Sequence, residues 1–220
     1  MLSPEMEDYL KAVYGLETEG DARVSTGEVA EALDVEPATA ATMLERLADR
    51  GLVDREKYEG VRLTKEGETV ALEVLSHHRL LEAYLAEALD YSWSEVHEEA
   101  DRLEHHISEE FERRVAAALG DPERDPHGAP IPRESLEPPG DDDVVTLAEC
   151  EVGERVVVSR VEDEEPEVLD FLEDRGVVPG AEAVVDEVAP FGMVSLSLDG
   201  GRVSLPREAA GVVAVEVATG

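Results

Sequence analysis

The fold is decided first by residues 25–63, which read STGEVAEALDVEPATAATMLERLADRGLVDREKYEGVRL. Ser25 followed three residues later by Glu28 is a capping box, which predicts that a short helix begins here. Pro37 suits the first position of a second helix, and Gly51 is a natural stop at its end. The stretch therefore predicts two helices joined by a short turn.

Apolar residues follow the second helix on both sides of a further turn. Leu52–Val53 and Val61–Leu63 flank the turn sequence Tyr58–Gly60, which predicts a β-hairpin. Apolar side chains at helical spacing between Glu5 and Leu16 predict one more helix upstream. The order helix, helix, turn, helix, hairpin is that of a winged helix-turn-helix, which places its second helix-turn-helix helix in the major groove of DNA.

Longer helices and then short strands are predicted after the hairpin. One helix begins near Thr64 and reaches at least Leu85, and a second is expected from about Ser94 to Leu119. Residues 120–143, rich in Pro, Gly and Asp, form a connection. The β-like runs that follow are typical of a small barrel. They are Arg155–Val161, Ala183–Val188, Met193–Leu198, Arg202–Leu205 and Val212–Val217.

The net charge of the chain is −35, from 54 acidic and 19 basic residues. Only Lys11, Lys57 and Lys65 are lysines, and the other basic residues are arginines. A hydrophobic fraction of 42% and clear periodicity argue against a disordered acidic protein. We interpret the charge as a halophile's adaptation to salt that screens repulsion over about 3 Å at 1 M. On this interpretation the charge does not exclude nucleic acid as a partner.

Two negative signals bear on location and chemistry. No stretch approaches the roughly 20 apolar residues that a membrane span needs, and Met1–Glu5 does not look like a secretion signal. The single cysteine, Cys150, excludes an internal disulfide and a multi-cysteine zinc site. We therefore expect a cytoplasmic protein with no membrane partner.

Most of the histidines are concentrated in one part of the chain. Five of the six fall between His77 and His106, and His78 lies one helical turn before Glu82. If residues 94–119 form one helix, four possible metal ligands share an arc of roughly 100° on its surface. They are His97, Asp101, Glu104 and His105. Imidazoles and carboxylates meeting between two packed helices suit a divalent first-row metal.

Other interpretations of these residues remain open. In so acidic a chain, carboxylates beside histidines also arise on solvated helix faces, and a winged-helix regulator can sense a signal other than metal. The sequence His97–Asp101 is also loosely similar to the H-E-x-x-H helix of metallohydrolases, with Asp101 replacing the second histidine. Nothing downstream supplies an obvious third ligand, which disfavours the metallohydrolase.

Several separated motifs resemble the diphtheria toxin repressor family, which includes iron- and manganese-dependent repressors. They are DYLKAVY at 8–14, HRLLE at 78–82, VHEEADRLEH at 96–105 and PHGAPIP at 126–132. The resemblance runs from about Glu5 to Pro132 and is weaker beyond. It implies a repressor of metal-uptake genes, not an enzyme, that binds operator DNA as a homodimer. The implied α+β fold has a winged helix-turn-helix at 1–72, a helical metal-binding and dimerisation domain with linker at 73–140, and an SH3-like, FeoA-like β-barrel at 141–220.

The resemblance also implies two metal sites. The primary site would comprise Asp8, Asp101, Glu104 and His105. The ancillary site would comprise His78, Glu82 and His97. Some members add ligands from the SH3-like domain, placed here at Glu164 and Glu167. Because some relatives have Met and Cys where this chain has Asp8 and Asp101, its harder oxygen donors favour Mn²⁺ as the cofactor, although Fe²⁺ also accepts such sites.

DNA contacts are expected from the second helix-turn-helix helix and from the wing. Pro, Ala and Thr side chains near the start of this helix can touch thymine methyl groups, and Thr can also hydrogen-bond to a base. The basic residues that follow can contact phosphates. The expected DNA-binding residues are Pro37, Ala38, Thr39, Thr42, Arg46, Arg50, Lys57 and Arg62. The interleaved acidic residues leave open the alternative that these basic side chains form only surface salt bridges. A metal that joins Asp8 to Asp101, Glu104 and His105 would couple the DNA-binding domain to the dimerisation helix.

Overall fold

The computed structural model describes residues 2–18, 23–56, 59–132, 145–162, 165–189 and 192–218. The chain forms two compact units. The first contains the chain up to His77 together with the segment Glu104–Ile107. The second contains most of the chain from His78 onward.

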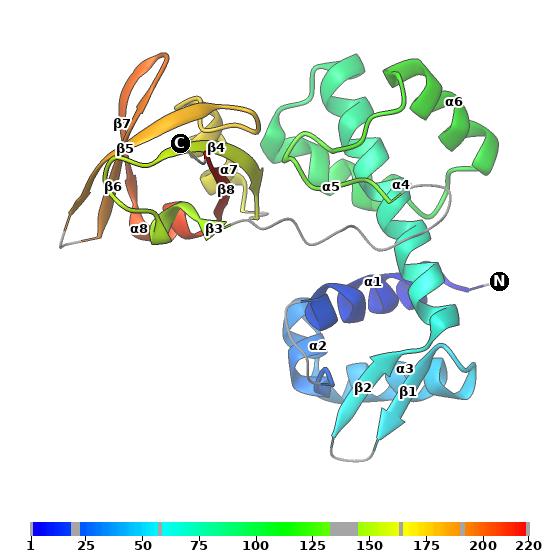
Figure 1. Ribbon diagram of the computed structural model, residues 1–220. Coiled ribbons are helices and arrows are strands. Elements are labelled where there is room, and N and C mark those ends of the chain that lie inside the picture. Colours follow the sequence, from blue (N-terminus) through cyan, green and yellow to red (C-terminus); the bar gives the residue numbers. More distant parts are fainter. Residues whose placement is uncertain are drawn as a thin grey trace. The chain divides into compact units, whose positions relative to one another are not determined.

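The first unit is a three-helix assembly with a two-stranded wing (Figure 1). Its buried core is built from the helical apolar positions and the hairpin, with Leu10, Leu44 and Val61 fully buried. The predicted winged helix-turn-helix is confirmed. Its elements are α1 (Pro4–Thr18), α2 (Thr26–Ala32), α3 (Pro37–Asp49), β1 (Val53–Glu56), β2 (Gly60–Leu63) and the first turns of α4 (Lys65–Leu89).

Local sequence signals explain where these elements begin and end. The backbone N–H of Glu28 donates to Ser25 Oγ, and the N–H of Ser25 donates to the Glu28 carboxylate at 2.8 Å, which is the predicted capping box. Pro37 occupies the first turn of α3. Gly51 ends that helix with φ of 74°, a left-handed conformation that glycine adopts without a steric cost. The strands β1 and β2 pair antiparallel with Val53 opposite Leu63.

The second unit begins with the helical segment that carries most of the histidines. The prediction of one helix over residues 94–119 is wrong, because the chain forms α5 (Trp93–Leu103) and α6 (Glu109–Leu119). Residues 104–106 turn the chain, and Ser108 starts the new helix by accepting a hydrogen bond from the backbone N–H of Phe111. The expected single arc of ligands is therefore split, with Glu104 and His105 lying beyond the end of α5.

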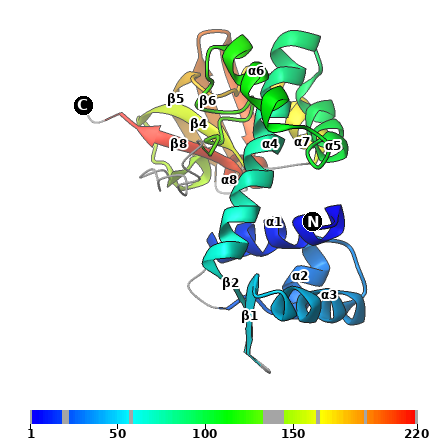
Figure 2. The ribbon, with the colours of Figure 1, turned by 90° about the vertical axis from the view of Figure 1, so that its right-hand side faces the viewer.

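The C-terminal part of this unit is an antiparallel sheet in the order β3-β8-β4-β5-β6-β7, which Figure 2 shows from a second side. The five predicted runs are strands, and their inward side chains, such as Val158, Val185 and Leu196, form a buried core. The helix α7 was not predicted. The elements are β3 (Val145–Thr146), a 3-10 turn η1 (Leu147–Glu149), β4 (Arg155–Val161), α7 (Pro166–Glu173), β5 (Glu182–Ala189), β6 (Met193–Leu198), β7 (Gly201–Pro206), α8 (Arg207–Gly211) and β8 (Val213–Val217).

Among the residues that the structure describes, no helix combines the length and apolar character that crossing a bilayer requires.

Candidate metal centres and DNA-binding surface

Asp8, Glu104 and His105 meet in the first unit, and we call them the N-terminal cluster. Asp8 comes from α1, whereas the other two follow α5, about a hundred residues later. His105 Nε2 lies 2.8 Å from Asp8 Oδ1 and 3.4 Å from Glu104 Oε1. One possible ligand atom from each residue lies within 4.8 Å of the others. The chain thus brings three possible metal ligands together between α1 and the segment after α5.

The electrostatics of the N-terminal cluster are those of partly buried carboxylates. Burial raises the pKa of Asp8, and the neighbouring His105 opposes that increase. The side chain of Glu104 is only 1% exposed. His105 also directs Nδ1 to Glu7 at 2.8 Å, so that both of its ring nitrogens face carboxylates. Such a set of oxygen and imidazole donors is ready to accept a cation.

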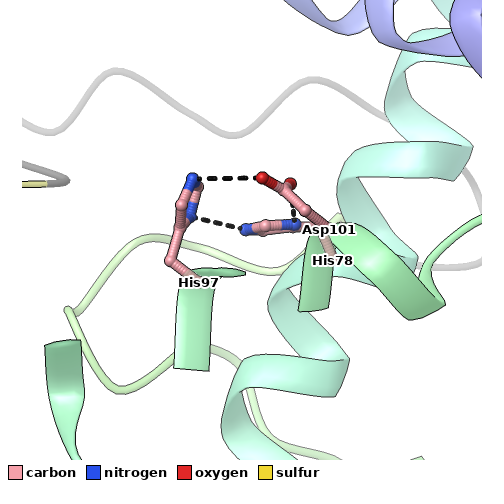
Figure 3. A group of neighbouring side chains, drawn as sticks. All are labelled: His78, His97 and Asp101. Atoms are coloured by element: carbon pink, nitrogen blue, oxygen red, sulfur yellow. Dashed lines mark hydrogen bonds and ion pairs between the residues drawn. The ribbon is translucent and has the colours of Figure 1, made fainter. Parts of the chain in front are cut away.

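A second group lies on α4 and α5, and we call it the helical cluster: His78, Glu82, His97 and Asp101. Figure 3 shows the two imidazoles and Asp101 directed toward one another. His78 Nδ1 is 3.2 Å from Asp101 Oδ1, and His97 Nε2 is 3.5 Å from Asp101 Oδ2. The Glu82 carboxylate completes the group, because its Oε1 lies 3.0 Å from His78 Nε2 and 3.3 Å from His97 Nδ1.

Glu82 is the buried anion of the helical cluster. Burial by itself would raise the pKa of Glu82, but hydrogen bonds from His78 and His97 hold it well below its usual range. Glu82 therefore keeps its negative charge inside the protein, where hydrogen bonds with the two imidazoles stabilise it. In metal centres a ligating imidazole commonly donates its other ring N–H to a carboxylate, and both ring nitrogens of His78 face carboxylates here.

Sequence reasoning missed two further residues beside Glu82. His127 Nδ1 lies 4.0 Å from Glu82 Oε1, and both His127 and Asp125 are buried. Burial, together with the nearby Glu82 charge, raises the pKa of Asp125 to about 6. His127 Nε2 is buried and makes no hydrogen bond within the described part of the chain. Glu82, Asp125 and His127 thus form a third group with metal-ligand spacing.

The sequence did carry a signal for this third group. Asp125 and His127 lie two residues apart in the stretch DPHGAP at 125–130, whose other residues are Pro, Gly and Ala. No helical or strand periodicity explains the presence of these two residues in the loop. Only the folded structure shows that they approach Glu82.

The remaining predicted ligands are placed differently. Asp101, expected in the primary site, contacts His78 and His97 of the helical cluster. Glu164 lies outside the described residues. Glu167 is exposed at the start of α7 and belongs to none of the three ligand groups found among the described residues.

The exposed face of α3 carries the predicted base-contacting residues. Pro37, Ala38, Thr39, Thr42 and Arg46 are exposed, while the opposite face is buried in the core. Thr42 Oγ1 donates to the carbonyl of Ala38 at 2.9 Å. The Thr42 hydroxyl is therefore bonded within the helix, which leaves its methyl group as the part available at this face.

Some of the basic residues in and near the wing form salt bridges with carboxylates. Arg50 is exposed, and Arg62 on the wing is half exposed with its Nε 3.8 Å from Glu17. Lys57 lies outside the described residues. Arg23, which sequence reasoning did not select, pairs with Asp54 and Glu56 and so neutralises part of the acidic wing. This reduces the repulsion that phosphates would meet at β1.

Comparison with known proteins agrees with this architecture. Residues 1–61 match the N-terminal DNA-binding domain of the iron-dependent repressors, residues 64–133 match their metal-binding and dimerisation domain, and residues 145–217 match the FeoA domain. The chain is 36% identical to the iron-dependent repressor IdeR of Mycobacterium tuberculosis over 222 residues, covering 96% of each chain. It is 32% identical to the diphtheria toxin repressor of Corynebacterium glutamicum, over 97% of this chain and 96% of that protein.

Solved structures give the same result. A manganese-dependent transcriptional repressor in complex with manganese superposes with a TM-score of 0.88 at 35% identity, covering 97% of this chain and all of that one. The predicted fold class, with a winged helix-turn-helix, a helical domain and a small β domain, is thereby confirmed. The chain belongs to the iron-dependent repressor family, of which the diphtheria toxin repressor is a member.

Proposed function

We propose that this protein is a metal-activated transcriptional repressor that binds operator DNA as a homodimer and responds to Mn²⁺ or Fe²⁺. The observation that carries the proposal is the N-terminal cluster, in which Asp8 of α1 meets Glu104 and His105 from beyond α5. Relatives named as iron- or manganese-dependent repressors support the same conclusion. Control of metal-uptake genes is the expected outcome.

The chain's own residues suggest how metal would act. Asp8, Glu104 and His105 would hold the ion, which supplies the positive charge that neutralises their carboxylates. Without it, α1 and the segment after α5 lose that shared ion and are joined there only through the weaker ion pairs of the cluster. When the ion is bound by both α1 and the segment after α5, the winged helix-turn-helix is held in one position. A dimer then presents its two recognition helices to half-sites about 34–36 Å apart. Metal and operator then favour one conformer, so each strengthens binding of the other.

The helical cluster supports a second metal site. His78, Glu82 and His97 remain candidate ligands, and Asp101 contacts both histidines. We infer Mn²⁺ as the favoured metal because the donors are oxygen and imidazole nitrogen. Cys150 offers no sulfur to these sites because it is buried in the core of the C-terminal sheet.

The hydrolase alternative is disfavoured by the exposure of Glu98. This residue occupies the position of the general base in an H-E-x-x-H helix. Its side chain is 78% exposed and pairs with Arg102 at 2.7 Å. Because a general base must reach the metal-bound water, a carboxylate held at the surface by an arginine does not fit that role.

A metal titration tests the proposed function. Operator fragments selected in vitro should bind the purified protein about 5- to 150-fold more tightly with Mn²⁺ than with a chelator, which is the usual range of coupling between two sites. The measurement is fluorescence anisotropy of labelled operator in concentrated KCl, with a scrambled duplex as control. Operator affinity that is independent of Mn²⁺ and Fe²⁺ would favour a regulator of another signal.

A second prediction concerns how the operator is read. Since the Thr42 hydroxyl is bonded to Ala38, its methyl group is the part available to a thymine methyl. Thr42→Val keeps the methyl and should bind the operator as the wild type does. Thr42→Ser loses it and should bind about 4-fold more weakly per recognition helix, from roughly 0.8 kcal/mol per buried carbon.

Replacing the contacted thymines by uracil should reproduce the Thr42→Ser loss in the wild-type protein, and should add little to it in the variant. Equal binding of Thr42→Ser and wild type would show that the methyl group does not read the base. A large loss in Thr42→Val would show that the hydroxyl reads it. Competition assays with matched duplexes measure both.

A further inference from the structure

Lys11 pairs with the buried carboxylate of the N-terminal cluster. It lies on α1, three residues after Asp8, and its Nζ is 3.0 Å from both carboxylate oxygens of Glu104. The Lys11 side chain is 23% exposed and that of Glu104 is 1% exposed. An ammonium group thus faces the whole carboxylate edge of a residue that we place among the metal ligands.

A buried carboxylate needs a positive partner, because an isolated charge is costly away from water. Glu104 could obtain that partner from a bound cation or from Lys11. The same oxygen, Oε1, lies 3.0 Å from Lys11 Nζ and 3.4 Å from His105 Nε2. An ion held by Glu104 and His105 would therefore lie within a few ångströms of the ammonium, and two positive charges so close repel strongly.

We propose that Lys11 is a tethered competitor for the metal: it neutralises Glu104 when no ion is bound and must leave when one binds. This inference rests on the proposed function of the N-terminal cluster. Lys11 thereby sets the metal concentration at which the repressor is activated. The metal-free protein keeps a folded, charge-balanced cluster, and weak or scarce ions do not displace the lysine.

The chemistry of lysine suits this role better than that of arginine. Its charge is compact and sits on a flexible four-carbon stem, whereas a guanidinium would grip the carboxylate with two parallel hydrogen bonds. Part of the Lys11 side chain already reaches water, because 23% of it is exposed. The chain has only three lysines among its 19 basic residues, and one of them is at this position.

Calorimetric titration with Mn²⁺ tests the competition. Lys11→Met removes the charge and keeps the length of the stem, so it should bind Mn²⁺ about tenfold more tightly than the wild type. Its metal-free form should melt at a lower temperature, because Glu104 is left without this partner. Lys11→Arg keeps the charge and should bind Mn²⁺ no more tightly than the wild type.

A charge control is needed because removing any cation from so acidic a protein attracts Mn²⁺ in general. Lys65→Met removes an equal charge from an exposed position at the start of α4 and should leave Mn²⁺ affinity within about twofold of the wild type. Lys11→Met binding Mn²⁺ as weakly as the wild type, or more weakly, would overturn the proposal and make Lys11 a positioning residue that stays on Glu104. A wild type that binds no Mn²⁺ would instead overturn the proposed function.

Amine labelling of the unmodified protein gives a readout that does not depend on how the variants fold. A limiting amount of an acetylating reagent is added at fixed pH with and without Mn²⁺, and peptide mass spectrometry compares Lys11 with Lys65. Displacement of the ammonium should increase acetylation of Lys11 several-fold relative to Lys65 when Mn²⁺ is bound. Unchanged or slower acetylation of Lys11 would show that it remains on Glu104 and would overturn the competition.

Discussion

His105→Ala is expected to remove most of the gain in operator affinity that Mn²⁺ provides, a loss of about 5- to 150-fold at saturating metal. His105 lies after α5, and its Nε2 contacts Asp8 of α1. Its removal therefore takes away one of the proposed metal ligands that join these two segments. Binding measured with a chelator present should change little, because the metal-free affinity does not use this coupling. The measurement is operator anisotropy across a range of Mn²⁺ concentrations.

The adjacent His106 offers a matched control. It is exposed and belongs to none of the three ligand groups among the described residues. His106→Ala should therefore keep the full response to Mn²⁺. If His105→Ala responded to Mn²⁺ as strongly as His106→Ala does, the N-terminal cluster would not be the activating site, and the helical cluster would have to carry the response.

Gly67→Ala is expected to destabilise the protein by about 3 kcal/mol, although alanine favours helices. Gly67 lies in the first turn of α4, where a Cβ would come 1.9 Å from the carbonyl oxygen of Leu52 and 3.3 Å from Leu63 Cδ2. Thr64 Oγ1 donates hydrogen bonds to the carbonyls of Gly51 and Leu52, which joins the start of α4 to the segment before β1. The helix would have to move away from the wing, because a backbone oxygen cannot rotate aside.

Gly15→Ala is the control for the helix propensity of this change. Gly15 lies in α1, and its added Cβ would meet nothing within 4 Å. This variant should gain about 0.5–1 kcal/mol, since alanine loses less backbone entropy than glycine on folding. Urea unfolding of the two metal-free variants measures the difference. Equal stability of both would show that α4 can shift on the wing at little cost.

The parts of the fold that the sequence predicted are those with short-range causes. The capping box of Ser25 and Glu28, the proline at the start of α3 and the left-handed Gly51 each act within a few residues, so their effect can be recognised without the rest of the chain. Alternating apolar residues likewise predicted the C-terminal strands, because one face of each is buried. The helix break after Leu103 was missed, since apolar periodicity continues across it and only the Ser108 cap marks the new start.

The sequence by itself determined that the candidate metal ligands are histidines and carboxylates with no nearby thiol. It also determined the order of elements in the winged helix-turn-helix. Only the tertiary structure decided how those ligands are grouped. Asp8 and His105 are 97 residues apart, Lys11 and Glu104 are 93 apart, and His127 reaches Glu82 from a loop without periodicity. Such contacts arise because burying the apolar faces of several helices together fixes which polar edges meet, and no pattern within one segment records that outcome.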